Sequence, residues 1–109
     1  MMSRVGHVYY EDIYAGDIIE TDDGFVFNYD EEYLISDNPA ISLTMSKKQK
    51  SYFSKVLFPF FDGLIPEGYL LDLAISKWSL DRKDRMGILL KVCRDTIGAV
   101  SVRGEDNEK

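Results

Sequence analysis

The chain contains one histidine, His7, and one cysteine, Cys93, the side-chain types that most often supply a general base and a nucleophile. No hydroxyl or thiol can be assigned to His7 from its spacing, so we interpret it as a partly exposed strand residue. Cys93 ends an apolar run, which is typical of a small core residue. A single cysteine cannot form a disulfide within the chain, and no Cys/His set could hold structural zinc, so a reducing compartment is expected.

Other acidic and basic residues offer weaker candidates for chemistry. The acidic pairs Asp22-Asp23 and Glu31-Glu32 lack the loop spacing of a calcium site, and we interpret them as solvated turn and helix-start residues. The tripeptide Cys93-Arg94-Asp95 is similar to a kinase catalytic triplet but lacks the Asn that should follow it, so we interpret Arg94 and Asp95 as a structural pair. Glycine-rich nucleotide-binding motifs are also absent, and we expect no cofactor and no metal.

Protein recognition is a better fit to the segment around Tyr69. A short apolar stretch, a Pro66-Glu67 helix start and then Gly68 place Tyr69 in the first turn of a helix, close to a surface loop. Tyr69 either packs on the core or serves as an aromatic anchor with a polar tip for a partner.

Three β-type runs begin the chain and predict an antiparallel meander: His7–Tyr10, Gly16–Thr21 and Phe25–Tyr29. Asp22-Asp23-Gly24 supplies the turn between the last two. The alternation in the third run places Phe25, Phe27 and Tyr29 on one face.

The middle of the chain predicts one helical turn and a fourth strand. Asp30–Ile35 has acids at its N-terminal end, where the helix dipole favours them. Ile41–Met45 alternates and is expected to be the fourth strand. Lys47–Ser54 is polar and basic, which indicates a surface loop.

Three helices and a closing strand are expected in the second half. Pro59 can begin a short helix within Val56–Ile65, and Gly63 can end it. A second helix runs from Pro66 to about Trp78, and its wide apolar arc predicts that it is mostly buried. The third helix covers about Arg82–Cys93 with Ser79 or Asp81 as its N-cap, and Ile97–Val102 closes the sheet.

This order predicts an α+β fold, an antiparallel sheet with about three helices packed on it. We expect one domain over residues 1–103, followed by a polar C-terminal tail over 104–109. A chain of 109 residues is too short for a complete kinase or a (β/α)₈ barrel, so any catalysis would come from a small site.

The net charge of −6 argues against direct nucleic-acid binding. Between Val5 and Ser46 there are ten acids and no Lys or Arg, whereas Lys47 to Arg103 holds eleven Lys or Arg against six acids. The two halves either form solvated faces that attract each other, or the acidic half meets a basic partner. The sequence shows no signal-peptide core and no stretch of about 18 apolar residues, so no membrane association and a cytoplasmic location are expected.

Two separated motifs resemble those of the N-terminal domain of HipA-type serine/threonine kinase toxins. Residues 60–68 (Phe-Phe-Asp-Gly-Leu-Ile-Pro-Glu-Gly) are similar to the family's F-F-x-N/G-L-L-P-E/D-G. Residues 94–100 (Arg-Asp-Thr-Ile-Gly-Ala-Val) are similar to its R-D-x-x-G-A-[VL] element, although Cys93 stands where the family usually has Gly. Ile41–Met45 resembles the family's [IL]-S-L-S-[LM]-P segment more loosely, with Ser46 at the position of the proline.

This resemblance implies a standalone domain, because the family's catalytic residues lie in a kinase domain that these 109 residues do not include. The chain is similar to HipS, the separate small antitoxin of tripartite HipB/HipS/HipT systems. The implied function is to bind and inhibit a HipT-like kinase at the place where the fused domain would sit, with a HipB-like helix-turn-helix protein as a possible further partner. The alternative is a non-inhibitory subunit that completes the kinase or bridges it to the HipB-like protein.

The resemblance also implies which residues meet the kinase. An aromatic residue after the P-E-G segment is directed at the kinase active site, and Tyr69 occupies that position where a Trp is expected of the nearest relatives. The expected partner-binding residues are Phe61, Asp62, Gly63, Leu64, Ile65, Pro66, Glu67, Gly68 and Tyr69.

Overall fold

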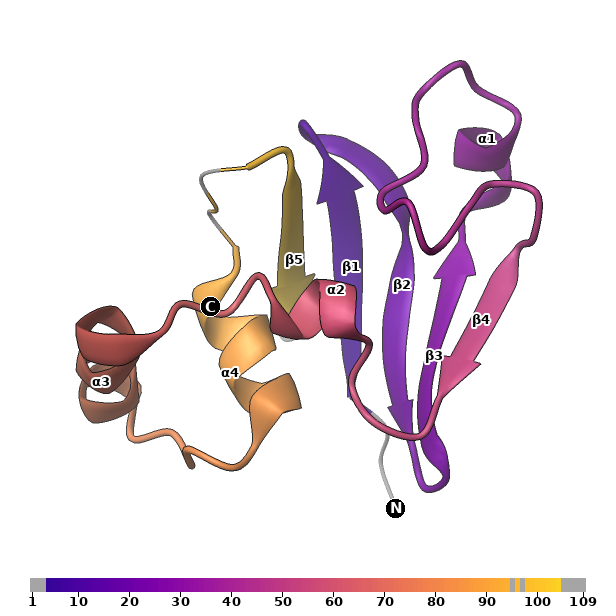
Figure 1. The fold of residues 1–109 in the computed structure, drawn as a ribbon. Coiled ribbons are helices and arrows are strands. Elements are labelled where there is room, and N and C mark those ends of the chain that lie inside the picture. The colour runs from indigo at the N-terminus through magenta and orange to yellow at the C-terminus, as the bar shows by residue number, and fades with distance from the viewer. Residues whose placement is uncertain (1–3, 95, 97, 105–109) are drawn as a thin grey trace.

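Five strands form one antiparallel sheet with the strand order β4-β3-β2-β1-β5 (Figure 1). The computed structural model describes residues 4–94, 96 and 98–104. Its strands are β1 (Val5–Tyr10), β2 (Ile13–Thr21), β3 (Gly24–Tyr29), β4 (Ser51–Ser54) and β5 (Val100–Gly104). Its helices are α1 (Glu31–Leu34), α2 (Pro59–Asp62), α3 (Gly68–Trp78) and α4 (Arg85–Val92). The predicted α+β class is confirmed.

Two tight turns build the predicted β1-β2-β3 meander. Glu11 and Asp12, which join β1 to β2, have φ values of 50° and 72°, the left-handed geometry of a two-residue hairpin. The β2–β3 turn ends at Gly24, whose φ is 152°. A Cβ atom at Gly24 would lie 2.5 Å from the carbonyl oxygen of Ser54, so only glycine fits against β4 there.

The core lies between the sheet and the helices. Val8, Ile18, Phe27 and Val102 present fully buried side chains from four different strands. The rings of Phe27 and Phe61 lie 5.7 Å apart and join β3 to α2. Burial of side chains of this size supplies about 1.5–3 kcal/mol each, which makes this face the main source of stability.

The predicted fourth strand is wrong. Ile41–Met45 forms a turn with one isolated bridge between Ser42 and Met45, and the fourth strand is instead β4, inside the segment expected to be a loop. Ile41 and Met45 are buried because the Tyr29 hydroxyl accepts from the Ile41 amide at 3.0 Å and donates to the Met45 carbonyl. The apolar alternation therefore marks two anchors of a loop.

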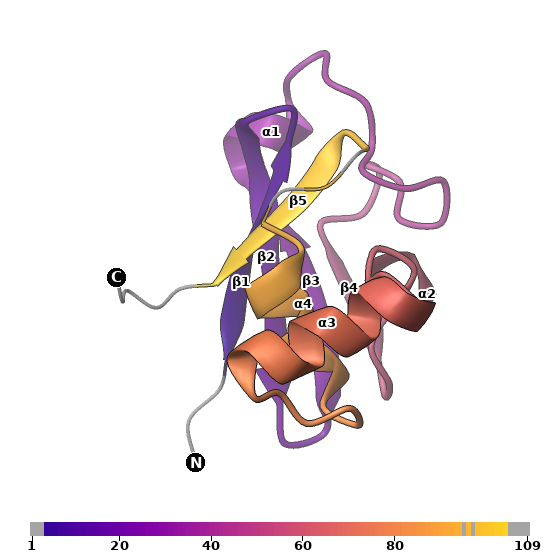
Figure 2. The same ribbon diagram turned by 90° about the vertical axis from the view of Figure 1, so that its left-hand side faces the viewer.

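The helices α2, α3 and α4 lie on one face of the sheet, and α3 lies farthest from it, on the outer side of α4 (Figures 1 and 2). The prediction that this helix is mostly buried is wrong, since only Leu71 and Ala74 of α3 are buried. α1 is the expected single turn, with Asp30 as its N-cap. Pro59 begins α2 and Gly63 is its C-cap, as predicted.

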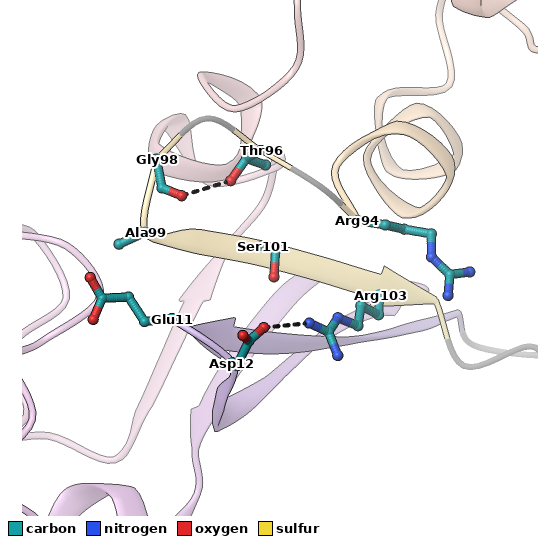
Figure 3. A pocket seen from close by; sticks show the side chains of 8 residues that line it. All are labelled: Glu11, Asp12, Arg94, Thr96, Gly98, Ala99, Ser101 and Arg103. Carbon is teal, nitrogen blue, oxygen red and sulfur yellow. Dashed lines mark hydrogen bonds and ion pairs between the residues drawn. The ribbon is translucent and has the colours of Figure 1, made fainter.

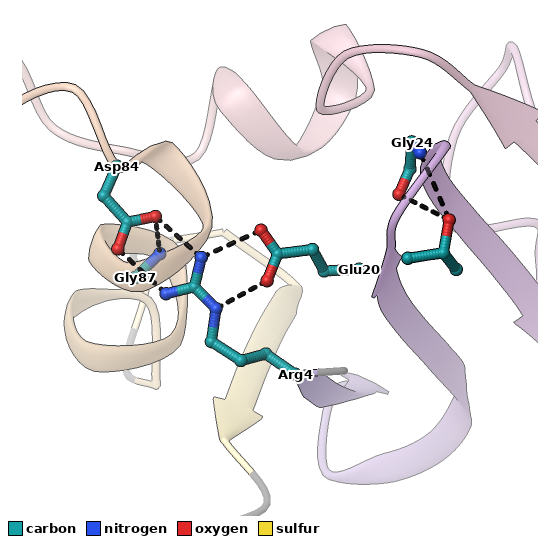
Figure 4. A network of polar contacts seen from close by, with 6 residues as sticks. Arg4, Glu20, Gly24, Asp84 and Gly87 are labelled. Atoms are coloured by element: carbon teal, nitrogen blue, oxygen red, sulfur yellow. Dashed lines mark hydrogen bonds and ion pairs between the residues drawn. The ribbon is translucent and has the colours of Figure 1, made fainter. Parts of the chain in front are cut away.

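The start of α4 also differs from the prediction. Its N-cap is Asp84, not Ser79 or Asp81, and its carboxylate accepts from the Gly87 amide at 3.1 Å. Arg4 holds this carboxylate with two hydrogen bonds of 2.8 Å and binds Glu20 on β2 at 2.6 and 2.9 Å (Figure 4). Because Arg4 is 80 positions away from Asp84, local sequence could not identify this cap.

The closing strand is confirmed, but its bounds move to Val100–Gly104, antiparallel to β1. Gly104 therefore belongs to the sheet and not to the expected tail. Ile97, at the start of the predicted strand, and residues 105–109 lie outside the described residues.

Candidate functional site

Two buried side chains attach the segment between α2 and α3 to the core. Phe61 is fully buried and its ring lies 6.1 Å from that of Phe58 and 5.3 Å from that of Phe60. Ile65 is also buried, and its amide donates to the Asp62 carbonyl at 3.1 Å. Both side chains therefore support the segment from below and are not available to a partner.

Polar contacts tie the same segment to α4. The Asp62 carboxylate accepts from Arg85 Nε at 2.7 Å, and the Cys93 thiol donates to the Leu64 carbonyl at 3.4 Å. Burial raises the pKa of Cys93 to about 11, so the thiol is protonated at neutral pH. The prediction that Cys93 is a core residue is confirmed.

Gly68 sets the direction in which α3 leaves this segment. Its φ is 63°, in the left-handed region that residues with a Cβ rarely adopt. Glu67 is the N-cap of α3 but makes no side-chain capping bond. Tyr69 consequently stands in the first helical turn, as predicted, with 74% of its side-chain surface exposed.

Tyr69 shares an apolar surface with two residues that the sequence analysis treated as buried. Leu70 is 63% exposed and Leu73 is 48% exposed. Helical spacing puts these three residues on the side opposite Leu71, which packs inward. We call Tyr69, Leu70 and Leu73 the outer face of α3. An apolar arc wider than one core-facing stripe was the signal in the sequence for this second face.

The predicted partner-binding residues therefore fall into three groups. Those at the surface are Gly63, Glu67, Gly68 and Tyr69. Those half-buried are Asp62, Leu64 and Pro66, and the two core residues are Phe61 and Ile65. The structure brings the surface group together around the N-terminal end of α3.

The predicted position of His7, half-exposed on a strand, is confirmed. Its Nδ1 lies 2.7 Å from Asp17 Oδ1, which also accepts from the Tyr14 hydroxyl at 2.6 Å. Burial first, and then the hydrogen bond to Asp17, raise the pKa of Tyr14, so its hydroxyl remains protonated at neutral pH. A protonated hydroxyl donates to Asp17 and holds this carboxylate in place beside His7.

The acidic pairs lie where the sequence predicts. Asp22 and Asp23 are exposed in the β2–β3 turn, and Glu31 and Glu32 are exposed in the first turn of α1. Within residues 4–94, 96 and 98–104, no three His, Cys, Asp or Glu side chains gather closely enough to hold a metal ion. Asp95, the expected partner of Arg94, lies outside the described residues.

Among the described residues, no helix is both long and apolar enough to cross a membrane.

Comparisons with known proteins agree over nearly the whole chain. A family model described as HipA N-terminal domain matches residues 6–103. The solved N-terminal domain of HipA toxin superimposes with a TM-score of 0.73 at 28% identity, over 99% of this chain and 98% of that one. An uncharacterized protein of Haemophilus influenzae strain Rd is 30% identical over 102 residues, 94% of this chain and 93% of its own length. The chain therefore belongs to the HipA N-terminal domain family.

Proposed function

We propose that this protein is an antitoxin that binds and inhibits a HipT-like serine/threonine kinase. Its family is that of a non-catalytic domain of HipA toxins, which indicates a component of a HipA-related toxin–antitoxin system and is consistent with a protein that is not an enzyme. In this proposal residues 1–103 form one domain, which docks where the fused domain of HipA-type kinases sits. A cytoplasmic location and a HipB-like helix-turn-helix protein as a further partner belong to the same proposal.

The observation that carries the proposal is the outer face of α3. Tyr69, Leu70 and Leu73 are exposed on a helix whose start is held by buried Phe61 and Ile65. Exposed apolar side chains on a fixed support lose little conformational freedom when a partner covers them. Tyrosine is also among the residues that contribute most to protein interfaces, since its ring is large and its hydroxyl stays hydrogen-bonded.

The contact region follows from the exposure of each predicted residue. Gly63, Glu67, Gly68 and Tyr69 meet the kinase directly, and Leu70 and Leu73 extend the contact along α3. Asp62, Leu64 and Pro66 lie at its margin, while Phe61 and Ile65 act from beneath as supports.

Growth rescue tests the inhibitory role. The chain and a HipT-like kinase are co-expressed, and rescue of growth is compared for the wild type, Tyr69→Ala and Leu73→Ala. We expect both variants to weaken rescue at unchanged protein levels. The control is Leu43→Ala, because Leu43 is fully exposed in the 35–50 loop, far along the chain from α3. Equal rescue by Tyr69→Ala and the control would remove Tyr69 from the mechanism.

A phosphorylation assay separates the two candidate roles. With purified proteins, an inhibitor lowers kinase turnover in proportion to the fraction of kinase bound. A non-inhibitory structural or bridging subunit binds with equal or higher turnover, and that result would replace the antitoxin proposal.

A further inference from the structure

The motif at residues 94–100 takes no part in the proposed kinase contact, yet it borders a surface cavity (Figure 3). The cavity has a volume of about 320 Å³. Arg94, Thr96, Gly98 and Ala99 line it from the motif, Ser101 and Arg103 from β5, and Glu11 and Asp12 from the β1–β2 turn. The motif thus helps to build a pocket at the β5 edge of the sheet, apart from the outer face of α3.

Several groups in this pocket already have partners. Arg103 lies over the Tyr9 ring at 4.0 Å and forms an ion pair of 3.1 Å with Asp12. Thr96 Oγ1 donates to backbone carbonyls, at 3.2 Å to Gly98 and at 2.6 Å to Val100. These contacts fix the floor and the loop of the pocket.

Two donors in the pocket have no such use. Within residues 4–94, 96 and 98–104, neither the Arg94 guanidinium nor the Ser101 hydroxyl makes a hydrogen bond or ion pair. Arg94 is exposed at one end of the pocket in Figure 3, and Glu11 is exposed at the other, with the Asp12–Arg103 pair and Ser101 between them. The pocket therefore presents an available cation and hydroxyl at one end and a carboxylate at the other.

We propose that this pocket binds a carboxylate, the side chain of a Glu or Asp in a protein partner, between Arg94 and Ser101. A guanidinium offers two parallel N–H donors to a carboxylate, which gives both attraction and orientation. Glu11 and Asp12 disfavour a doubly charged phosphate more strongly than a singly charged carboxylate, by like-charge repulsion. A surface pocket lined by exposed and half-exposed residues suits a side chain presented by a protein better than a small ligand, which needs enclosure.

This site lies outside the proposed kinase contact, so its test does not need the kinase. The isotope-labelled chain is titrated with a capped Gly-Glu-Gly tripeptide, with the neutral Gly-Gln-Gly analogue and with inorganic phosphate, and the backbone amide shifts are followed by NMR. We expect saturable shifts at Thr96, Gly98 and Ser101 with the Glu peptide and none with the Gln peptide.

Variants assign the interaction to its residues. Arg94→Gln should weaken binding of the Glu peptide about tenfold or more, as expected for loss of a charge-assisted hydrogen bond. Ser101→Ala should weaken it by a smaller factor. Lys91→Gln is the matched control, because it removes the same charge from an exposed α4 position that does not line the pocket, and it should bind as the wild type does.

Three results would overturn the proposal. The first is the absence of saturable shifts at the pocket with the Glu peptide, and the second is equal binding by Arg94→Gln and Lys91→Gln. The third is tighter binding of phosphate than of the Glu peptide, which would assign the pocket to phosphate. Since Arg94 and Ser101 do not support the core, both variants should keep the wild-type shifts elsewhere in the chain.

Discussion

Phe61 and Tyr69 are aromatic residues eight positions apart, and their surroundings give them opposite roles. Phe61 is fully enclosed by α2, β3 and neighbouring rings, whereas Tyr69 is 74% exposed at the start of α3. The first side chain contributes to folding and the second is free to contribute to binding. The resemblance to a known family identified both residues, but it could not divide support from contact, because that division depends on burial.

Stability measurements should separate these two roles. Phe61→Ala leaves a cavity in the core, and we expect the free energy of unfolding to fall by about 3–5 kcal/mol. Tyr69→Ala removes an exposed ring, and we expect a change within about 0.5 kcal/mol. Urea unfolding followed by circular dichroism measures both. A loss above about 2 kcal/mol for Tyr69→Ala would show that its ring packs on the fold.

The backbone at Gly68 allows a second test at single-residue scale. Its φ of 63° is unfavourable for alanine, although no atom lies within 4 Å of the position of a Cβ. We expect Gly68→Ala to lower the free energy of unfolding by about 1–2 kcal/mol through backbone strain alone. Gly98→Ala is the matched control, since Gly98 also has open space around it but no positive φ. Equal effects of the two substitutions in thermal unfolding would contradict this explanation.

At the scale of elements, the accuracy of the sequence-based predictions depended on how local the determining contacts are. The meander, α1 and α2 were predicted because turn residues, the Asp30 cap and Pro59 act within a few positions. The fourth strand was misplaced because pairing with β3 selected Ser51–Ser54, while the Tyr29 hydroxyl held Ile41–Met45 in a loop. Both causes are contacts between residues more than ten positions apart.

The burial of α3 failed for a related reason. Its apolar arc predicted a buried helix, but α4 covers only one side, so Leu71 packs inward while Leu70 and Leu73 face outward. The periodicity of a helix gives the width of its apolar surface and does not say which part meets the same chain. The candidate site was therefore predicted at Tyr69 and missed along the rest of the helix.

The cap of α4 makes a pH-dependent contribution that can be measured. Hydrogen bonds from Arg4, and to a lesser degree the Gly87 amide, hold the pKa of Asp84 below its ordinary value. A lowered carboxyl pKa stabilises the fold above the unfolded pKa of about 3.9, and this stabilisation is lost as pH falls through the folded pKa. Asp84→Asn keeps a capping acceptor but removes the charge. We expect the unfolding free energies of the wild type and Asp84→Asn to differ by about 1 kcal/mol at pH 7 and to converge by about pH 2.

Chemical unfolding across this pH range, with Asp81→Asn as control, tests the assignment. Asp81 is an exposed acid three positions before the cap, and among the described residues it has no bond to Arg4. Asp81→Asn should follow the wild-type pH dependence, and Arg4→Met should follow that of Asp84→Asn. Parallel curves for the wild type and Asp84→Asn down to about pH 2 would contradict the role of the Arg4 contact.

Across the whole molecule, the uneven charge of the sequence is partly used inside the fold. Acids of the first half pair with basic residues of the second, Asp12 with Arg103 at 3.1 Å and Glu31 with Lys50 at 2.9 Å. These exposed pairs favour the interpretation that the two halves attract each other, although each contributes little to stability. The larger-scale asymmetry is the layering, with the sheet, then α4, then α3 as the outermost layer (Figure 2).

This layering predicts that α3 opens independently of the sheet. Only Leu71 and Ala74 of α3 are buried, so opening this helix exposes little apolar surface. Hydrogen exchange followed by NMR should show lower protection for α3 amides than for β1 and β2 in the free chain. Leu71→Ala should lower α3 protection selectively, whereas Ile88→Ala, in the fully buried face of α4, should lower protection throughout. Addition of the HipT-like kinase should then protect α3 more than β3 and β4, because the proposed contact covers the outer face of α3. Protection of α3 equal to that of β1 in the free chain would contradict independent opening, and unchanged α3 protection in a complex shown to form would move the kinase contact elsewhere.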